Sequence, residues 1–579
     1  MQNPFGFTID GLDVAGFLGL MRGLFTLIAL GAGVVVARKT DDRRIGRVVL
    51  WVAIAGHALA WFATVFPLPN LYAANGSMDR ENHLGWSNVV ALGFSPLYTF
   101  QVKHLHFEPL WPVLTAIAAG FDVDRIVAVM HWAPLVAGLA LLFAVRFTWA
   151  RDKTKAPGVE IEASFAALGA LLLLAVPGDF WGPFRNPWAL TLLLKPNHTL
   201  GLVLAPLAAV ALARAANWKS RLFAGFVLQL VGWAFVIHMA LFVAGLGIFV
   251  ALSWITQRSE RRKDLVDVAA AVGINLLIVS PYLVMLVLAY PVFQGNDRYR
   301  FSGLTERPIE AALRLGVFFL LSAFAAWRTY REGGRLGRIL STQWLTAHLI
   351  WQVYPILGLF GLAREQDELF YWCRFWTGLF AGAGVFRMAR QALLLFRPSG
   401  VETGSRVLGA ATALSLMFLL PSLLPAWWDP ATMDRYYVSA REPIPDWIAE
   451  PNRFIRTRTP PAAVFGGDRY YARWIAAYGA RRVLLSYSLN APSDVHRRID
   501  AEGAVLHRGS EALFTEALDR YGLQYLLLTN RTLEESNVTL EDLRARPDLE
   551  VVYDREFKVT RVVIFRILPR PTPGKAGDR

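Results

Sequence analysis

The stretch MALFVAGLGIFVALSWIT, residues 239–256, decides the fold class, because it continues for the length of a membrane crossing without a charged side chain. The residues that follow it, QRSERRK (257–263), hold four basic side chains. Short loops rich in Lys and Arg face the cytoplasm. The stretch therefore predicts a transmembrane helix that ends on the cytoplasmic side.

The rest of the chain repeats this pattern. Of its 579 residues, 55% are hydrophobic and 20 are Trp, and the mean hydropathy of +0.37 exceeds what a soluble core needs. Apolar runs of spanning length lie near 17–37, 48–66, 126–148, 161–176, 198–215, 222–237, 239–256, 266–290, 309–327, 340–361, 374–396 and 406–427. We therefore expect a polytopic α-helical membrane protein with about 12 transmembrane helices.

The net charge of +14 has a topological explanation. Basic residues cluster in alternate connections, whereas the region after about residue 430 is close to neutral. The basic excess thus belongs to the membrane part, and no nucleic-acid partner is expected. The single cysteine, Cys373, excludes an internal disulfide and a cysteine metal cluster.

The other connections are poor in Lys and Arg and rich in aromatic residues, Pro, His and acids, and we place them outside: 67–125, 177–197, 291–308 and 362–373. The same alternation places the C-terminal region outside. We expect residues 1–428 to form the transmembrane domain, with 67–125 as its large first outer loop. The predicted location is the bacterial inner (cytoplasmic) membrane, with the C-terminal domain extracytoplasmic.

After about residue 430 the hydrophobic period changes. Strands are predicted at 462–468, 481–486, 524–529, 549–554 and 559–567, and helices at 470–479 and 510–522. Strands alternating with helices predict a small, mainly parallel α/β domain over 429–568. The Pro-rich, charged segment 569–579 is predicted to be a disordered tail.

Ionisable residues gather in the outer loops. MDRENHLGW (78–86) contains Asp79, Glu81 and His83, and KHLHFEPLW (103–111) contains His106 and Glu108. The apolar stretch after Glu108 is too short to span, so it is expected to re-enter or to lie along the surface. The simplest alternative is that MDREN is a solvated turn.

Basic side chains lie in the later outer loops. Candidates for binding a phosphate group are Arg185, Lys195 and His198 in the second loop, and Arg364 and Arg374, with Glu368 between them, in the last. An arginine that merely snorkels at a helix end is the alternative for each. The lone histidines His57, His131, His238 and His348, within apolar helices, are interpreted as packing residues.

Together these features resemble the GT-C superfamily of integral membrane glycosyltransferases. The resemblance is carried by acids in the first large outer loop, the segment FEPLWPVLTAI (107–117), the late loop ELFYWCRFW (368–376) and the terminal α/β domain that opens with TPPAAVFGGD (459–468). It implies an enzyme that transfers a sugar, with inversion, from a polyprenyl-phosphate donor to a glycan, lipid or protein acceptor on the outer face. The acid-Arg-acid spacing at 79–81 and the extra first helix depart from the family pattern.

The resemblance also implies roles for the acids and bases. An inverting transfer needs a carboxylate base, for which Asp79 is the first candidate and Glu81 the second. Alternatively, Asp79, Glu81 and His83 hold a divalent cation, Mg²⁺ or Mn²⁺, that neutralises the departing phosphate. Otherwise Arg374 supplies that charge.

Two other classes of function remain open. One is a catalytically inactive relative that acts in the assembly of cell-envelope polysaccharide or lipid. The other is a transporter, which internal repeats and mid-membrane charges would favour, and neither feature is visible in the sequence.

Overall fold

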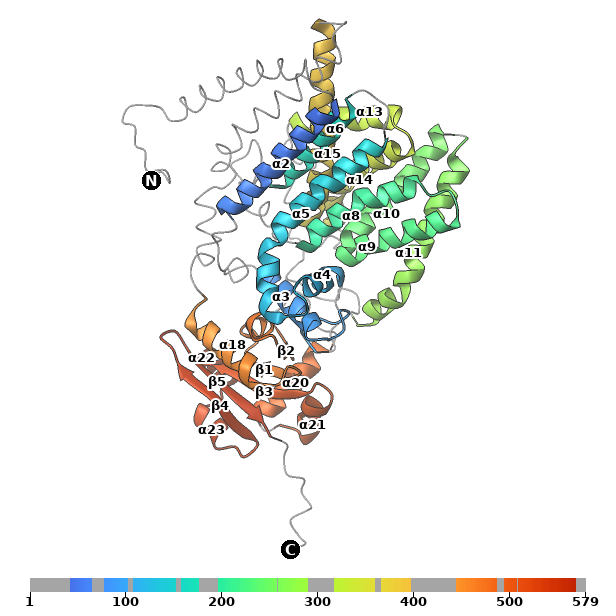
Figure 1. Ribbon diagram of the computed structural model, residues 1–579. Helices are drawn as coiled ribbons and strands as arrows, with labels where there is room; N and C mark the ends of the chain where they lie inside the picture. Colours follow the sequence, from blue (N-terminus) through green and yellow to red (C-terminus); the bar gives the residue numbers. More distant parts are fainter. Residues whose placement is uncertain are drawn as a thin grey trace, which may run out of the picture.

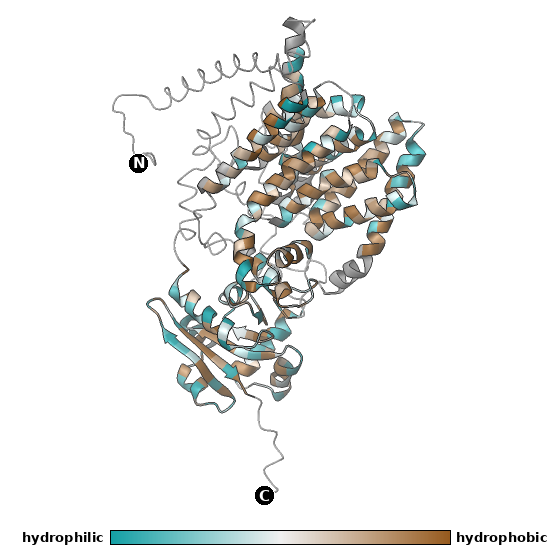
Figure 2. Cartoon of the chain, viewed as in Figure 1, coloured by the Kyte–Doolittle hydropathy of each residue, from teal (hydrophilic) through white to brown (hydrophobic). Residues whose placement is uncertain are grey.

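The structure, a computed structural model, describes residues 42–64, 78–102, 108–152, 158–175, 196–257, 259–289, 317–359, 366–396, 444–486, 494–507 and 509–568. A helical bundle is joined to a small C-terminal unit with one sheet (Figure 1). Hydrophobic residues dominate the bundle, and hydrophilic residues cover much of the C-terminal unit (Figure 2).

The bundle helices coincide with ten of the apolar runs predicted above. They are α2 (Asp42–Thr64), α5 (Val123–Asp152), α6 (Val159–Ala175), α8 (Pro196–Ala213), α9 (Trp218–Ala234), α10 (Val236–Thr256), α11 (Arg261–Ala289), α13 (Val317–Glu332), α14 (Arg335–Leu359) and α15 (Gln366–Phe396). Among the described residues, Val123–Arg151 and Val236–Thr256 are long and apolar enough to cross a membrane. The predicted runs 17–37 and 406–427 lie outside the described residues.

Side-chain hydrogen bonds tie α11 to both α9 and α10. Gln229 of α9 accepts a hydrogen bond from Asn275 of α11 at 2.8 Å, whereas Ser253, near the end of α10, bonds to Asp264 at the start of α11. The chain reverses between α9 and α10 at one extended residue, Phe235, with φ −158° and ψ 110°. The predicted runs 222–237 and 239–256 are therefore two separate helices.

Glycines allow α6 and α15 to pack closely. A Cβ added at Gly169 of α6 would collide with the carbonyl oxygen of Gly378, and one added at Gly382 would collide with the carbonyl oxygen of Phe165. Gly378 and Gly382 are four residues apart, so they lie on the same face of α15. Small residues at this spacing bring the two backbones together.

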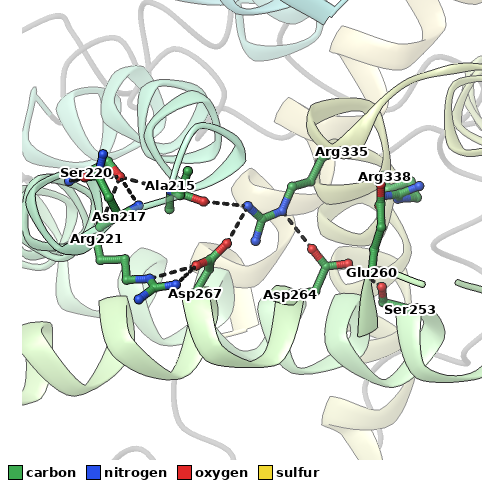
Figure 3. A network of polar contacts seen from close by, with 11 residues as sticks. Ala215, Asn217, Ser220, Arg221, Ser253, Glu260, Asp264, Asp267, Arg335 and Arg338 are labelled. Atoms are coloured by element: carbon green, nitrogen blue, oxygen red, sulfur yellow. Dashed lines mark hydrogen bonds and ion pairs between the residues drawn. The ribbon is translucent and has the colours of Figure 1, made fainter. Parts of the chain in front are cut away.

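The ends of the helices that carry basic loops are held by buried ion pairs. Arg335 lies between two acids of α11, and its guanidinium is 2.8 Å from both Asp264 and Asp267 (Figure 3). It also donates to the carbonyl oxygen of Ala215 at 2.9 Å, and Arg221 pairs with Asp267 at 2.7 Å. We call these five residues the arginine end. They join the end of α8 to the starts of α9, α11 and α14.

Two short helices precede α5 along the chain, α3 (Met78–Ala91) and α4 (Leu110–Ala118). The predicted short apolar stretch after Glu108 is the nine-residue α4, which lies beside α3 (Figure 1). The segment MDRENHLGW is helical, so the solvated-turn alternative is wrong for its backbone.

The C-terminal unit contains a mixed five-stranded sheet in the order β2-β1-β3-β5-β4. The strands are β1 (Val464–Gly467), β2 (Arg482–Val483), β3 (Leu523–Thr529), β4 (Leu549–Glu556) and β5 (Arg561–Ile567). The helices and turns are α18 (Asp446–Arg458), α19 (Ala472–Trp474), η3 (Ile475–Gly479), α20 (Val495–Leu506), α21 (Glu511–Asp519), α22 (Asn530–Ser536) and α23 (Leu540–Arg544).

The expected mainly parallel sheet is only half right. β1 pairs in parallel with β2 and β3, but β5 pairs antiparallel with both β3 and β4. The short connection 557–560 explains the β4–β5 pair, because it permits only an antiparallel hairpin. The predicted helix 470–479 is one turn of α-helix followed by a π-turn.

The first outer loop completes the edge of this sheet. The amide of Val102 donates to the carbonyl oxygen of Val483 in β2, and the amide of Val483 donates to the carbonyl oxygen of Phe100, both at 3.0 Å. Nearby, buried Asn88 of α3 donates to the carbonyl oxygens of Ala476 and Ala477 at 3.0 and 2.8 Å. Residues 88 and 100–102 thus pack on the C-terminal unit.

Candidate active site

The predicted acids of the first outer loop lie in α3. Asp79 is in its first turn, and its side chain lies outside the described residues. Glu81 is 3% exposed and faces the C-terminal unit. One of its carboxylate oxygens accepts a hydrogen bond from Trp474 Nε1 at 2.8 Å, and the other is 2.9 Å from Arg473 Nε. The carboxylate of Glu81 therefore attaches α3 to α19.

The contact between Glu81 and the C-terminal unit is buried on several sides. Tyr478 of η3 lies close to Glu81, and its pKa is raised well above the ordinary value by burial and then by the Glu81 charge. His83, one turn after the start of α3, is buried and meets the ring of Trp86 edge to face, with centroids 4.9 Å apart. Glu81 and His83 thus belong to the packed face of α3.

The start of α4 meets the start of α8. Asn197 Nδ2 donates a hydrogen bond to a carboxylate oxygen of Glu108, the residue that stands just before the N-cap of α4. Asn197 is 3% exposed, and its side-chain oxygen has no hydrogen-bond partner in the described part of the chain. Two predicted outer loops, 67–125 and 177–197, therefore come together at this point.

The next residue, His198, is the centre of an aromatic cluster. Its ring stacks on Phe235 with centroids 3.8 Å apart, and it meets the rings of His238 and Tyr371 edge-on at 5.8 and 6.2 Å. His238 lies against Trp372 of α15 at 5.0 Å. We call these five residues the histidine end. It joins the start of α8, the α9–α10 corner and the first turns of α15.

Arg374 is carried by the same part of α15. It is 3% exposed and lies three residues after Tyr371, which places both on one helix face. Arg374 therefore lies in the buried part of α15 that also carries Tyr371 and Trp372.

The other predicted site residues, or their side chains, lie outside the described part of the chain. Arg185, Lys195, His106 and Arg364 lie outside them, and Glu368 is in the first turn of α15 with its side chain outside them. The structure therefore brings together Glu108, His198 and the helix that bears Arg374.

A divalent cation finds little support at the predicted ligands. Glu81 is engaged by the cationic Arg473, which disfavours a second cation on the same carboxylate. In the described residues no group of three or more His, Cys, Asp or Glu side chains could hold a metal. Arg473 would therefore compete with a cation for the Glu81 carboxylate, and the side chain of Asp79, the other predicted acid ligand, lies outside the described residues.

The sequence analysis did not identify three residues that lie at the candidate site or contact its predicted residues. His238 was interpreted as a packing residue because lone histidines in apolar helices usually are. Arg473 and Trp474 lie almost 400 positions from Glu81, and nothing local marks them as its partners. The short interval between the runs 222–237 and 239–256 was the one available signal, since it puts His238 at a helix start.

No family model matches the chain, and no curated protein matches it. Solved structures do. ArnT from Cupriavidus metallidurans in the apo state is 14% identical, covers 90% of this chain and 98% of its own, and has a TM-score of 0.49. The same protein bound to undecaprenyl phosphate is 13% identical, and the match covers 89% of this chain and 97% of that one with a TM-score of 0.48.

The archaeal oligosaccharyltransferase AglB from Archaeoglobus fulgidus, in complex with an inhibitory peptide and a dolichol-phosphate, is 12% identical. The match covers 84% of this chain and 69% of that one, with a TM-score of 0.42. These matches extend over most of the length of this chain.

Proposed function

We propose that this protein is a membrane glycosyltransferase of the GT-C type, which transfers a sugar from a polyprenyl-phosphate donor to an acceptor on the outer face. The observation that carries the proposal is the convergence at the histidine end. Residues from the first outer loop, the second outer loop and the late loop helix meet there: Glu108 and Asn197, then His198 and Tyr371. They lie at the bundle end opposite the basic loops.

In the proposed reaction Asp79 is the base. Its carboxylate takes the proton of the acceptor hydroxyl as the oxygen forms a bond to the anomeric carbon. The bond between that carbon and the phosphate oxygen breaks on the opposite face, with inversion, and polyprenyl phosphate leaves. Arg374 stabilises the negative charge that develops on the phosphate.

Glu81 has a different proposed role from that of a free base. Its contacts with Arg473 and Trp474 support a role in holding α3 against the C-terminal unit. We assign charge neutralisation to arginine and not to Mg²⁺ or Mn²⁺, and no step of the proposed reaction uses a metal ion.

The setting follows from the same pattern. We propose that the bundle crosses the bacterial inner membrane with the arginine end facing the cytoplasm and the C-terminal unit outside. The division into a transmembrane domain (1–428) and an α/β domain (429–568) belongs to this proposal. The acceptor class, glycan, lipid or protein, is left open.

An inactive assembly protein is the second candidate, and the engagement of Glu81 by Arg473 favours it, because one of two candidate bases is occupied. The two proposals differ in turnover. An assembly protein of this kind would bind the lipid but transfer no sugar from any polyprenyl-phosphate donor.

Sugar transfer by the purified full-length protein in lipid nanodiscs tests the proposal. Asp79→Asn is expected to lower kcat by about 10²–10⁴-fold, the usual contribution of a general base. Asp122→Asn is the matched control, since Asp122 is an outer-loop acid that accepts a hydrogen bond from the backbone of Asp124 and pairs with Arg125. Its kcat should be unchanged. Normal turnover in both Asp79→Asn and Glu81→Gln would refute the base assignment.

A further inference from the structure

Two exposed tryptophans lie near the arginine end of the bundle. Trp254 of α10 is 47% exposed, and Trp327 of α13 is 55% exposed. The guanidinium carbon of Arg261 lies over the ring of Trp254, 4.9 Å from its centroid, and that of Arg331 lies over the ring of Trp327 at 4.2 Å. We call these four residues the two tryptophan–arginine pairs. Each pair places a cation on an aromatic face at the surface of the bundle.

Both pairs lie near helix ends and at a similar level of the bundle. With 21 residues, α10 is about 32 Å long, close to the thickness of about 30 Å of the hydrocarbon core of a bilayer. Trp254 is two residues from the end of α10, so its indole belongs at the boundary between hydrocarbon and headgroups. Thr256 Oγ1 is 3.0 Å from Tyr330 Oη, which brings the ends of α10 and α13 together. Trp327 lies one turn before Tyr330 and therefore at a similar depth.

The charges of these two arginines are not neutralised by the acids around them. The acids nearest to them in the sequence are engaged by other arginines, in the pairs Glu260–Arg338, Asp264–Arg335 and Glu332–Arg328. Within the described part of the chain, neither Arg261 nor Arg331 forms an ion pair with a carboxylate. Each of them therefore presents a positive charge that the described residues do not compensate.

The chemistry of the pairs indicates the kind of ligand. A cation–π interaction attracts each guanidinium to the face of its indole. The N–H donors of a guanidinium lie in its plane and form a fork that matches two oxygens of a phosphate group. A guanidinium held over an indole at the membrane boundary keeps this fork at the level of the lipid phosphates.

The alternative explanation requires positive charge alone. Arginines snorkel from helix ends, and basic loops set the orientation of a membrane protein whatever they contact. Lysine would serve equally well for both purposes. Arginine is superior to lysine only where the planar fork and the aromatic ring take part, so the two explanations differ in the expected effect of lysine.

We infer that the two tryptophan–arginine pairs bind the headgroups of anionic phospholipids of the surrounding membrane. The guanidinium donates to the phosphate oxygens, and the indole packs beside the glycerol at the hydrocarbon boundary. An anionic headgroup is favoured over a zwitterionic one, because the ammonium group of a zwitterionic lipid brings a positive charge close to the arginine. The inference depends on the proposed place of the bundle in a membrane and not on sugar transfer.

Native mass spectrometry of the full-length protein in mild detergent tests the inference, with phosphatidylglycerol and phosphatidylcholine of identical acyl chains as probes. The unmodified protein should bind phosphatidylglycerol more tightly than phosphatidylcholine. Combining Arg261→Gln with Arg331→Gln should weaken binding of phosphatidylglycerol by about fivefold for each arginine removed, the usual contribution of a basic residue at an anionic membrane surface. Binding of phosphatidylcholine should change little.

The combination of Arg261→Lys with Arg331→Lys distinguishes the two explanations, because it keeps the charge and the topological signal but removes the planar fork. It should weaken binding of phosphatidylglycerol by about twofold to fivefold. Binding as tight as in the unmodified protein would overturn the inference, since charge alone would then suffice. Arg531→Gln is the matched control. Arg531 also lies over an aromatic ring, that of Tyr470 at 3.8 Å, but it pairs with Glu535 in the C-terminal unit, so lipid binding should not change.

The binding readout separates this inference from the proposed function. Equal binding of the two lipids by the unmodified protein would overturn the inference, and displacement of phosphatidylglycerol by an equal concentration of inorganic phosphate would overturn the lipid assignment. If the unmodified protein transfers no sugar but the lysine and glutamine variants lose affinity for phosphatidylglycerol as expected, the inference stands and the transferase proposal fails. If sugar is transferred but all these variants bind phosphatidylglycerol normally, the inference alone fails.

Discussion

The two ends of the helical bundle differ in whether their buried polar side chains have partners among the described residues. At the arginine end each buried carboxylate of α11 contacts an arginine, and Arg335 contacts two of them (Figure 3). At the histidine end His238 and Trp372 are equally buried but have no hydrogen-bond partner among the described residues.

Under the proposed function, this difference distinguishes polar groups that stabilise the fold from polar groups that bind a ligand. Closed ion networks hold helix ends in register, and their loss leaves an uncompensated charge. Open donors weaken the free protein and are retained where a ligand completes them. Mutations at the arginine end should therefore mainly change stability, and those at the histidine end should mainly change binding or turnover.

The largest stability effect is expected from Arg335→Ala. It leaves Asp264 without its arginine and Asp267 with Arg221 alone, so the folded state should lose about 3–5 kcal/mol. Thermal unfolding in detergent measures the change. The control Arg531→Ala removes an exposed pair with Glu535 and should leave the unfolding temperature nearly unchanged. Equal effects of the two substitutions would contradict the structural role of the arginine end.

At the histidine end, Arg374→Ala should act mainly on turnover. Loss of a charge that stabilises the departing phosphate is expected to reduce kcat by about 10²–10³-fold. The unfolding temperature should fall less than in Arg335→Ala. Arg262→Ala, which removes an exposed arginine from the first turn of α11, should keep full activity. A stability loss as large as that of Arg335→Ala, with normal kcat, would erase the contrast between the two ends.

The contact between α3 and α19 offers an intermediate case, because Glu81 is paired although it was a catalytic candidate. Arg473→Met removes the cationic partner of Glu81 and should cost about 1–3 kcal/mol. Hydrogen exchange of the amides in α3 should become faster. Adding Glu81→Gln should recover part of the loss, since no buried charge then remains. If the double variant recovers no stability, the Arg473–Glu81 pair is not what holds α3 against α19.

The smallest effect is expected in the solvated pairs of the sheet. Hydrogen bonds and charge from Arg561, and then Arg544, lower the pKa of Asp554. Its stabilisation is therefore fully present above the unfolded-state value of about 3.9 and is lost as the pH falls through the folded-state pKa. Asp554→Asn should cost less than about 1 kcal/mol at pH 7. The difference in unfolding temperature from the unmodified protein should shrink towards pH 2; a constant difference would contradict the assignment.

Much of the fold could be predicted because it depends on local patterns. Apolar runs such as 239–256 predicted the helices, and the change of period after residue 430 predicted the strands. The stretch after Glu108 was predicted to be too short to span, and the structure forms it as the nine-residue α4. Pairing is not local: the antiparallel β5 and the contact of Phe100 and Val102 with β2 depend on tertiary structure.

The candidate site was predictable in part for the same reason. Loop placement predicted that residues near Glu108 and His198 would meet, and Asn197 and Tyr371 now lie between and beside them. The status of His238 and Glu81 depends on which groups surround each side chain. His238 proves to lack a hydrogen-bond partner among the described residues, and Glu81 proves to contact Arg473 and Trp474. Neither fact has a signature in the sequence.

The strand contact between residues 100–102 and β2 has a consequence for how the polypeptide is made. Residues 100–102 are synthesised long before Val483. They can therefore form their hydrogen bonds with β2 only after the last part of the chain has been made. A separately expressed C-terminal fragment would present an unprotected β2 edge, a site for self-association. Co-expression of the two halves from separate genes should therefore give a more soluble product than the fragment alone.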